Sequence, residues 1–577
     1  MSIPGQAVNT VTDPFSKFQH VVVLMLENRS FDNLLGNLYG QKDCKTAFPL
    51  PAGKKFEGLH FGGPYFNVIP TTVNDGNAGK NLYTTRAGSY FQPYPDPGET
   101  YPQVNTQLAN EFNPAGNENK SDADKFAAPY NVPAGGMPAT PPMSGFITDF
   151  ISVLRSLQLK GCMGIFWKFL YKLFRVNAKW FKLNDKIKDY KVIMECYEND
   201  QVPVLTTLAH EFAVFDNWHC DVPSQTYPNR AFWHAGYSFG FVNNSPLTKW
   251  FKDSGDATLF NRMQDNNVSW NIYTDNIVSI TGIVHFNQLL PYHLGADKRF
   301  FSFKKFIADA GNGGLPSYSF VEPRFFTPHN DQHPSSYDSL NPVDNVGPVG
   351  SVLLGEKLIW EVYNAIKNST GDAGGKGNTW ENTLLIITHD EHGGCYDHVP
   401  PGPAPMPGIT GITDEQDFTF NRLGIRVPMV MVSAYIEPNT IVNAEQRHTS
   451  FIKTMCSKWG LNHLTERDNT APVFTDVFSK HNEPRNNNTW PQIPEPIIPK
   501  AHEEYDFSNQ LINDLEKNIL RSVSLWKTGS TADAEKIHTA KEAMQYLINL
   551  ADELPGADPE ELMHQGEWFK NLLKKRG

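Results

Sequence analysis

The stretch Thr388-His389-Asp390-Glu391-His392-Gly393-Gly394 directly follows the apolar run Leu384-Leu385-Ile386-Ile387. An apolar run of this length predicts a buried parallel strand. In open α/β sheets, ligands bind at the carboxyl ends of the strands, which is where Asp390 and Glu391 are expected. No Lys or Arg stands beside this acid pair to neutralise it. The stretch therefore predicts an α/β fold with a metal site at the edge of its sheet.

The same construction occurs near the N-terminus. The apolar run His20-Val21-Val22-Val23-Leu24-Met25-Leu26 ends in Glu27 and Asn28, which are two hard oxygen ligands. Such ligands suit magnesium, calcium or manganese, and zinc also accepts carboxylates. Either pair alone is also explained as a helix cap, because acidic and amide side chains favour helix N-termini. Two such strand ends in one chain favour the metal site.

Length, composition and charge narrow the class of protein. At 577 residues and 64.9 kDa, the chain is longer than a single core usually holds, so we expect one large domain with appendages. It carries 50 basic and 62 acidic residues, a net charge of −12, which excludes a general nucleic-acid-binding character. The six cysteines include no C-x-x-C pair, which argues against a disulfide framework and a zinc ribbon and favours free thiols.

Neither end of the chain indicates a membrane span or a cleaved leader. The N-terminus lacks the basic start and apolar core of a secretory signal, and we find no run of about 20 apolar residues. We therefore expect a protein that is cytoplasmic or exported by a signal-independent route, with attachment to a membrane surface left open.

Changes in pattern along the chain predict three regions. Residues 1–16 form a lead, residues 17–490 an α/β domain, and residues 491–577 a helical C-terminal extension. Within the α/β domain, residues 49–145 are rich in Pro, Gly and Asn and predict packed loops. Residues 155–188 form a second insertion, with a basic and aromatic helical pattern.

A third segment, Asp221 to Arg230, has the pattern of a nucleophile turn. It places hydroxyl residues between Pro223 and Pro228 and then begins a helix, whose N-terminus offers donors to an anion. Thr226 is the candidate nucleophile and Ser224 the alternative. An ordinary helix cap is the competing interpretation.

Together these segments resemble the phosphoesterase family of bacterial phospholipases C, plant non-specific phospholipases C and certain bacterial acid phosphatases. That family is a distant relative of alkaline phosphatases and sulfatases. The resemblance rests on Glu27-Asn28-Arg29-Ser30-Phe31-Asp32, on Pro223 to Arg230, on Asp390 to Gly394, and on Asp397-His398-Val399-Pro400-Pro401. Further matches are Glu322-Pro323-Arg324, Asn330-Asp331-Gln332-His333-Pro334, His448-Thr449-Ser450 and Leu464-Thr465-Glu466-Arg467. The resemblance implies an alkaline-phosphatase-like sandwich, with a mostly parallel central sheet and helices on both faces.

The resemblance also implies roles for single residues. A divalent metal would be held by oxygen ligands from Glu27, Asn28, Asp390, Glu391 and Thr226. Zn²⁺ is the metal we expect, with Ca²⁺, Mg²⁺ and Mn²⁺ as alternatives. Thr226 would attack phosphorus and form a phosphothreonine intermediate, since a metal-bound hydroxyl ionises more readily than a free one.

Histidines near the site would handle the proton of the leaving alcohol, because imidazole titrates near neutrality. His333 and His285 are the candidates for this role. Asn229, Arg230 and His392 are expected to bind the phosphate. Many relatives also carry a histidine in the segment that here reads Asp96-Pro97-Gly98-Glu99-Thr100-Tyr101. This chain has none there, so the resemblance leaves open whether that segment takes part in catalysis.

The helical pattern from Met163 to Lys182 bears on the substrate. Its bases recur at spacings of three and four residues, which places them on one stripe of a helix, and aromatic residues fill the rest. A basic stripe beside an aromatic face is typical of a helix in a lipid interface, and a buried helix with one solvated stripe is the alternative. The residues expected to contact the membrane are Trp167, Lys168, Lys172 and Arg175.

These features predict a phosphoric ester hydrolase. The first hypothesis is a metal-dependent phospholipase C that cleaves glycerophospholipids such as phosphatidylcholine to diacylglycerol and a phosphorylated headgroup. The alternative is an acid phosphatase that acts on soluble phosphomonoesters. Expected partners are a phospholipid substrate and, peripherally, a membrane surface, with no nucleic acid and no protein partner inferred.

Overall fold

The computed structural model describes most of the α/β domain and part of the C-terminal extension. The described residues are 14–40, 46–59, 63–160, 186–245, 249–250, 257–275, 279–294, 297–326, 329–334, 351–410, 414–478, 483–499, 512 and 514–550. The basic aromatic pattern from Met163 to Lys182 lies outside them.

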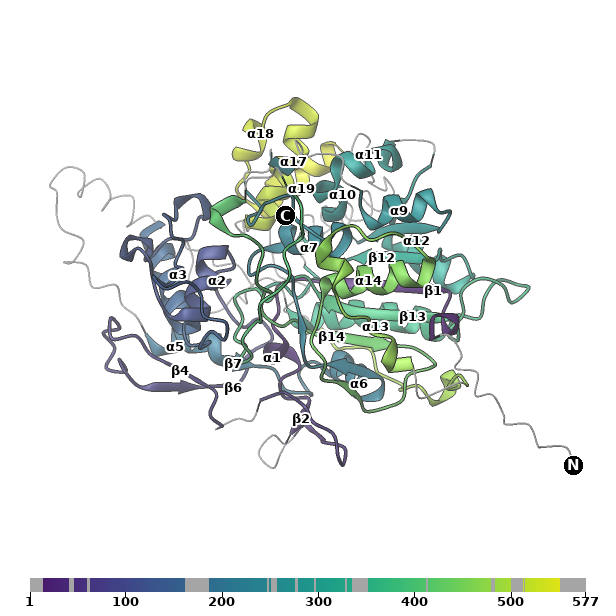
Figure 1. The fold of residues 1–577 in the computed structure, drawn as a ribbon, viewed down its shortest axis with the longest axis horizontal. Helices are drawn as coiled ribbons and strands as arrows, with labels where there is room; N and C mark the ends of the chain where they lie inside the picture. The colour runs from purple at the N-terminus through teal and green to yellow at the C-terminus, as the bar shows by residue number, and fades with distance from the viewer. Residues whose placement is uncertain are drawn as a thin grey trace, which may run out of the picture.

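An eight-stranded sheet forms the centre of the molecule (Figure 1). Its strands run in the order β11 (Phe300–Ser302), β10 (Trp270–Thr274), β12 (Tyr318–Glu322), β1 (His20–Leu26), β13 (Thr383–His389), β14 (Met429–Val432), β8 (Ala213–Phe215) and β15 (Thr440–Val442). Strand β14 runs antiparallel to both of its neighbours, and the other pairs in the sheet are parallel. The predicted α/β class with a mostly parallel sheet is confirmed.

The two apolar runs that predicted strands form adjacent central strands. β1 and β13 coincide with the predicted segments, and every side chain of β13 is buried, as is typical of a strand covered on both faces. The two strands pair in parallel from His20 opposite Thr383 to Leu26 opposite His389. The residues that follow each strand therefore emerge side by side at the same edge.

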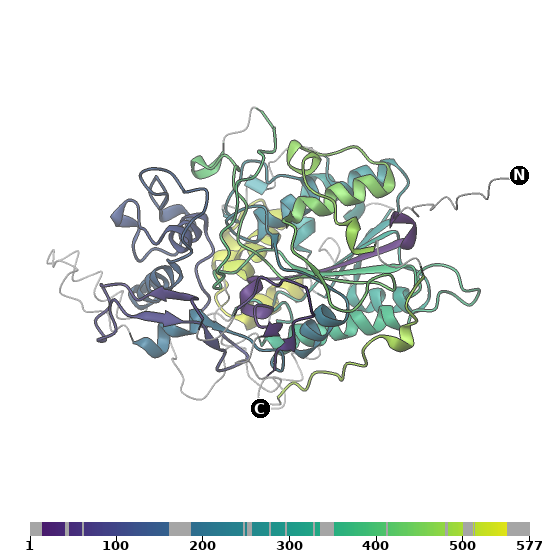
Figure 2. The same ribbon diagram turned by 60° about the horizontal axis from the view of Figure 1, so that its bottom comes forward.

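Helices lie on both faces of the sheet (Figures 1 and 2). The helices α6 (Pro203–Glu211) and α13 (Val352–Lys367) pack on each other, and α12 (Phe303–Gly311) packs on α13 and β10. The other main helices are α7 (Thr226–Ala235), α9 (Leu259–Asp265) and α14 (His448–Trp459). In α13 the buried residues Leu358, Ile359, Val362 and Ile366 recur at helical spacing, which fixes the face it turns to the sheet.

The loop-rich stretch 49–145 contributes to a lobe beside the sheet, at the left of Figure 1. Besides loops it holds the strands β4 (Phe66–Val68) and β5 (Asn81–Tyr83) and the helix α2 (Tyr101–Ala109). Helix α2 packs on α3 (Phe146–Lys160), and both bury apolar side chains in a separate core.

The C-terminal helices α17 (Asp514–Thr528), α18 (Ala532–Glu535) and α19 (Ala540–Asn549) lie at the top of Figure 1. Ile519 and Leu520 of α17 share a buried cluster with Tyr227 of α7 and Ile283 of α10 (Ile280–Val284). The described part of the extension is therefore packed on the helix that carries Thr226.

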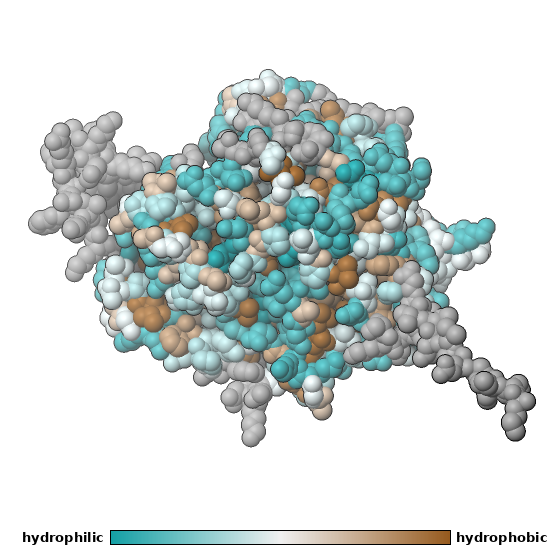
Figure 3. Space-filling model, in the orientation of Figure 1, coloured by the Kyte–Doolittle hydropathy of each residue, from teal (hydrophilic) through white to brown (hydrophobic). Residues whose placement is uncertain are grey.

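Two general properties follow from the described residues. Their four cysteines, Cys196, Cys220, Cys395 and Cys456, are buried free thiols. Within this part of the chain, no helix is both long enough and apolar enough to cross a bilayer. On the face shown in Figure 3, apolar residues are scattered among hydrophilic ones.

Candidate active site

The ends of β1 and β13 bring the two predicted acid pairs together. Glu27, Asn28, Asp390 and Glu391 are all completely buried. The backbone N–H of Asn28 donates to Asp390 Oδ1 at 3.1 Å, which ties one strand end to the other. Asn28 has a φ of 55°, a left-handed conformation that asparagine tolerates better than most residues. The turn after β1 therefore places the Asn28 side chain among the acids.

Thr226 is the first residue of α7 and points into this acid cluster. Its hydroxyl donates to Glu27 Oε2 at 3.1 Å. The loop before it is held by Asn229, whose Nδ2 lies 3.0 Å from the carbonyl oxygen of Val222 and 2.8 Å from that of Ser224. Asn229 thus braces the nucleophile loop, and its predicted contact with phosphate stays a prediction.

Arg230 lies one helical turn beyond Thr226 and reaches the same acid. Its Nε donates to Glu27 Oε1 at 3.1 Å, and the same atom lies 3.5 Å from Asp390 Oδ2. Its Nη1 lies 3.7 Å from Glu322 Oε1. The base that is missing beside Asp390 in the sequence is thus supplied by α7. Arg230 was predicted to bind phosphate, and that role stays a prediction.

Negative charge still exceeds positive charge in the cluster. Burial, and then the charge of Asp390, raise the pKa of Glu27 and of Glu391 well above the usual range. Three oxygens of the predicted metal ligands are buried and accept no hydrogen bond from any described residue: Asn28 Oδ1, Asp390 Oδ2 and Glu391 Oε1. Buried acceptors without donors are rare in folded proteins, and a divalent cation satisfies them together with the excess charge. The side chains present therefore fit the predicted metal.

Of the two predicted catalytic histidines, the structure brings His333 to the cluster. Its Nε2 lies 2.9 Å from Asn28 Nδ2, and its Nδ1 lies 2.7 Å from the carbonyl oxygen of Pro334. A carbonyl oxygen can only accept, so Nδ1 carries the proton and Nε2 accepts from Asn28.

His285 and His392 have different surroundings. His285 is buried against the rings of His234 and Phe239 and lies beside the backbone of Arg230. His392 lies beside Glu391 and contacts Gln107 through Nε2 at 2.7 Å. Burial lowers the pKa of both histidines to about 3, so both are neutral near pH 7. Their predicted roles in proton transfer and phosphate binding stay predictions.

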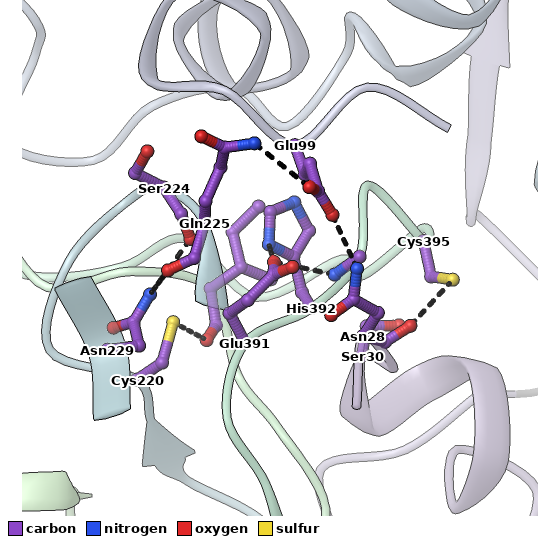
Figure 4. Close-up of polar contacts among 12 residues, drawn as sticks. Asn28, Ser30, Glu99, Cys220, Ser224, Gln225, Asn229, Glu391, His392 and Cys395 are labelled. Carbon is purple, nitrogen blue, oxygen red and sulfur yellow. Dashed lines mark hydrogen bonds and ion pairs between the residues drawn. The ribbon is translucent and has the colours of Figure 1, made fainter. Parts of the chain in front are cut away.

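Sequence reasoning missed two residues that line the cluster, Glu99 and Gln225. In Figure 4, Asn28 and Gln225 point toward Glu99 from two sides, with Glu391 between them. Gln225 Nε2 donates to Glu99 Oε1 at 3.0 Å, and Asn28 Nδ2 donates to Glu99 Oε2. Asn28 and Gln225 lie 71 and 126 residues from Glu99 along the chain, so the sequence gives no local signal of these contacts.

A second buried group lies beyond the turn after β1. Asp32, Asp397 and His398 have ligand atoms within 4.8 Å of one another, so their spacing would permit a metal ion. Arg426 already donates to both carboxylates, to Asp32 Oδ1 at 2.9 Å and to Asp397 Oδ1 at 3.0 Å. His398 Nδ1 contacts Asp32 Oδ2 at 2.6 Å. In this group Arg426 binds both carboxylates, whereas in the Glu27 cluster Arg230 leaves Asp390 Oδ2 and Glu391 Oε1 without a hydrogen-bond donor among the described residues.

Comparisons with known proteins show the family of this chain. The model of the Phosphoesterase family matches residues 18–462. The chain is 29% identical to non-specific phospholipase C6 of Arabidopsis thaliana over 488 residues, which cover 82% of this chain and 74% of that protein. It is 28% identical to phospholipase C B of Mycobacterium tuberculosis over 320 residues, which cover 50% of this chain and 57% of that protein.

Among solved structures, a protein in the alkaline phosphatase superfamily from Vibrio parahaemolyticus matches with a TM-score of 0.28 and 12% identity, over 48% of this chain and 65% of that one. The family match covers the residues from the start of β1 to the end of α14, including every strand of the central sheet. This chain belongs to the phosphoesterase family, and it is a phosphoric ester hydrolase.

Proposed function

We propose that this protein is a metal-dependent phospholipase C. It would hydrolyse glycerophospholipids such as phosphatidylcholine to diacylglycerol and a phosphorylated headgroup, through a phosphothreonine intermediate on Thr226. The names of its relatives support the substrate class, since several Arabidopsis thaliana proteins and bacterial proteins among them are phospholipases C.

One observation carries the mechanism: the Thr226 hydroxyl lies inside the acid cluster, bonded to Glu27. A threonine hydroxyl is a weak nucleophile and needs a base or a metal beside it. If Thr226 were only a helix cap, its hydroxyl would bond to the backbone of its own helix. The Thr226 hydroxyl instead points at a carboxylate that follows strand β1. This contact favours the nucleophile over the cap.

The metal would be held by Glu27, Asn28, Asp390 and Glu391, with Thr226 as a further oxygen ligand. When bound, it supplies positive charge that stabilises the negative charge on phosphate oxygens and on the attacking hydroxyl. All five ligands offer oxygen. Such a set suits Ca²⁺, Mg²⁺ and Mn²⁺ at least as well as Zn²⁺.

The chain's own groups account for the bonds made and broken. The Thr226 oxygen attacks phosphorus and its proton passes to Glu27, which already accepts it in a hydrogen bond. The bond from phosphorus to the glycerol oxygen breaks, and the leaving alcohol takes up a proton. Water then hydrolyses the phosphothreonine, which releases the phosphorylated headgroup and restores Thr226.

We assign protonation of the leaving alcohol to His333. It lies at the cluster, whereas His285 is buried among aromatic rings and stays neutral. In the structure His333 Nε2 faces Asn28 as an acceptor, so it would act after taking up a proton from solvent.

The test compares hydrolysis of phosphatidylcholine with that of p-nitrophenyl phosphate. The protein is stripped with a chelator and reloaded with Zn²⁺, Ca²⁺, Mg²⁺ or Mn²⁺ in turn, and the Asp390→Asn variant is assayed beside it. We expect diester hydrolysis that one of the metals restores and that Asp390→Asn lacks. Faster turnover of the monoester would favour the acid phosphatase, and full activity without metal would overturn the metal site.

A further inference from the structure

Glu99 lies at the boundary between the buried acids and solvent. It immediately precedes Thr100, the N-cap of α2, in the segment whose part in catalysis the sequence leaves open. Glu27, Asp390 and Glu391 are fully buried, while Glu99 is partly exposed. A carboxylate in this place is open to two kinds of role, as a further metal ligand or as a group that orients one.

Glu99 contacts two side-chain amides and the side chain of Glu391. Its Oε2 accepts from Asn28 Nδ2, and its Oε1 accepts from Gln225 Nε2 at 3.0 Å. Each carboxylate oxygen thus holds one amide nitrogen (Figure 4). Carboxylates are strong acceptors, so these bonds fix which end of each amide turns toward Glu99.

For Asn28 the consequence is an oriented ligand. An amide has a donor end and an acceptor end, and its terminal torsion is broad and roughly two-fold. Because Nδ2 is bound by Glu99 and lies 2.9 Å from His333 Nε2, Oδ1 is the end of the amide turned away from both of these side chains. Oδ1 has no donor among the described residues, as a metal ligand requires.

For Gln225 the consequence is a fixed helix start. Its Oε1 accepts from the backbone N–H of Asn244 at 3.0 Å, so both ends of this amide are bound. Gln225 is the N-cap residue of α7, and Thr226 is the first residue of that helix. Glu99 therefore joins the metal ligand Asn28 to the residue that precedes the nucleophile.

We propose that Glu99 is a positioning residue, which sets the amide of Asn28 so that Oδ1 faces the metal and couples it to the start of α7. This inference rests on the proposed function, because it assumes that Asn28 is a metal ligand. Outer contacts of this kind commonly tune metal sites, since they fix the orientation of the ligands.

A double-mutant cycle on metal affinity tests the proposal. Glu99→Ala removes both acceptor oxygens, and the Kd of the full-length protein is measured by calorimetry for Zn²⁺ and, separately, for Ca²⁺. We expect Glu99→Ala to weaken binding by about 10- to 100-fold, the usual effect of losing an outer contact. In an Asn28→Ala background, the same change should alter the Kd by less than about twofold, because the amide that Glu99 is proposed to orient is then absent.

The outcomes separate the alternatives. If Glu99→Ala weakens binding equally in both backgrounds, Glu99 is itself a ligand and the positioning role is wrong. If wild type binds metal and Glu99→Ala binds it as tightly, the inference fails while the metal site stands. If wild type binds neither metal, the proposed metal site fails first.

Two further variants keep the test independent of folding. Glu99→Gln keeps one acceptor oxygen and should weaken binding less than Glu99→Ala. Glu381→Gln removes the same charge at an exposed position before β13, at the opposite end of that strand from Asp390, and should leave the Kd unchanged. Circular dichroism and the unfolding temperature of each variant show whether it is folded. An equal loss of binding in Glu99→Gln and Glu381→Gln would overturn the proposal.

Discussion

Arg230 is the buried base of the acid cluster, and its side chain has no exposure to solvent. It pairs with Glu27 and lies within ion-pair distance of Asp390 and Glu322. Removing one partner of a buried ion pair leaves an uncompensated charge, which usually costs about 3–5 kcal/mol.

Arg230→Met should therefore lower the free energy of unfolding by about that amount in the absence of metal. Urea denaturation followed by circular dichroism at pH 7, with a chelator present, measures the change. A divalent metal should recover part of the loss, because it neutralises the same carboxylates. Unchanged stability would show that the acids are held without this base.

Thr226 and Ser224 compete for the role of nucleophile, and their contacts distinguish them. Ser224 donates its hydroxyl to the carbonyl oxygen of Val242 and so braces the loop, while Thr226 donates into the acid cluster. Thr226→Ala should abolish turnover and leave the unfolding temperature nearly unchanged. Quenching the wild type during turnover on phosphatidylcholine and mapping the phosphorylated headgroup by mass spectrometry should find it on Thr226, and an adduct on Ser224 would transfer the role.

At the residue scale, the sequence predicts ligands better than it predicts their partners. Asp390 and Glu27 are recognisable because each directly follows an apolar strand, which is a local pattern. Arg230 as their counter-charge and Glu99 as a partner of Asn28 are contacts between distant segments, and no spacing in the chain encodes them. They become visible only once the strands and α7 are placed.

At the scale of elements, the group around Arg426 joins three segments that flank the site. It links Asp32 of α1 (Phe31–Leu34), the stretch after β13 that holds Asp397 and His398, and the segment leading to β14. Burial opposes the charged form of His398, but Asp32 and Glu57 outweigh it and raise its pKa to about 9.

This shift predicts a pH dependence of stability. A pKa raised from 6.5 to about 9 in the folded state gives a contribution that is complete below pH 6.5 and lost as pH rises through 9. Its size is on the order of 3 kcal/mol. Unfolding free energies from pH 6 to 10 should fall across this window in wild type and stay flatter in His398→Gln, and parallel curves would contradict the linkage.

Element boundaries show where sequence patterns succeed and fail. β1 and β13 follow from continuous apolar runs, because strands buried on both faces need no alternation. Helix α2 was not foreseen, since its sequence Tyr-Pro-Gln-Val-Asn-Thr-Gln-Leu-Ala is weakly amphipathic. Its stability comes from a Thr100–Gln103 capping box and from packing against α3. The reversed direction of β14 likewise depends on long-range pairing.

At the scale of the whole molecule, the proposed lipid substrate requires access to a membrane surface. The basic and aromatic pattern of residues 163–182 predicts that attachment, and each basic residue near an anionic surface adds roughly 1 kcal/mol. Replacing Lys168, Lys172 and Arg175 by Gln should weaken binding to anionic liposomes, most strongly at low salt, where screening is least.

Hydrolysis of a soluble chromogenic ester serves as the control, because these substitutions leave the acid cluster intact. Its rate should stay nearly unchanged while liposome sedimentation falls. If liposome binding is the same in the variant and in wild type, the membrane prediction is wrong and the buried-helix interpretation is favoured.

The pairing of β1 also affects when the protein can fold during its synthesis. Both neighbours of this first strand, β12 and β13, lie about 300 residues or more further along the chain. β1 has six residues that are buried in the folded protein. At ribosomal speeds of about 5–20 residues per second, its first partner strand is synthesised on the order of 15–60 seconds after β1. Such late closure slows folding and leaves an apolar segment for chaperones to shield. Hydrolytic activity should therefore arise only after nearly the whole domain has left the ribosome.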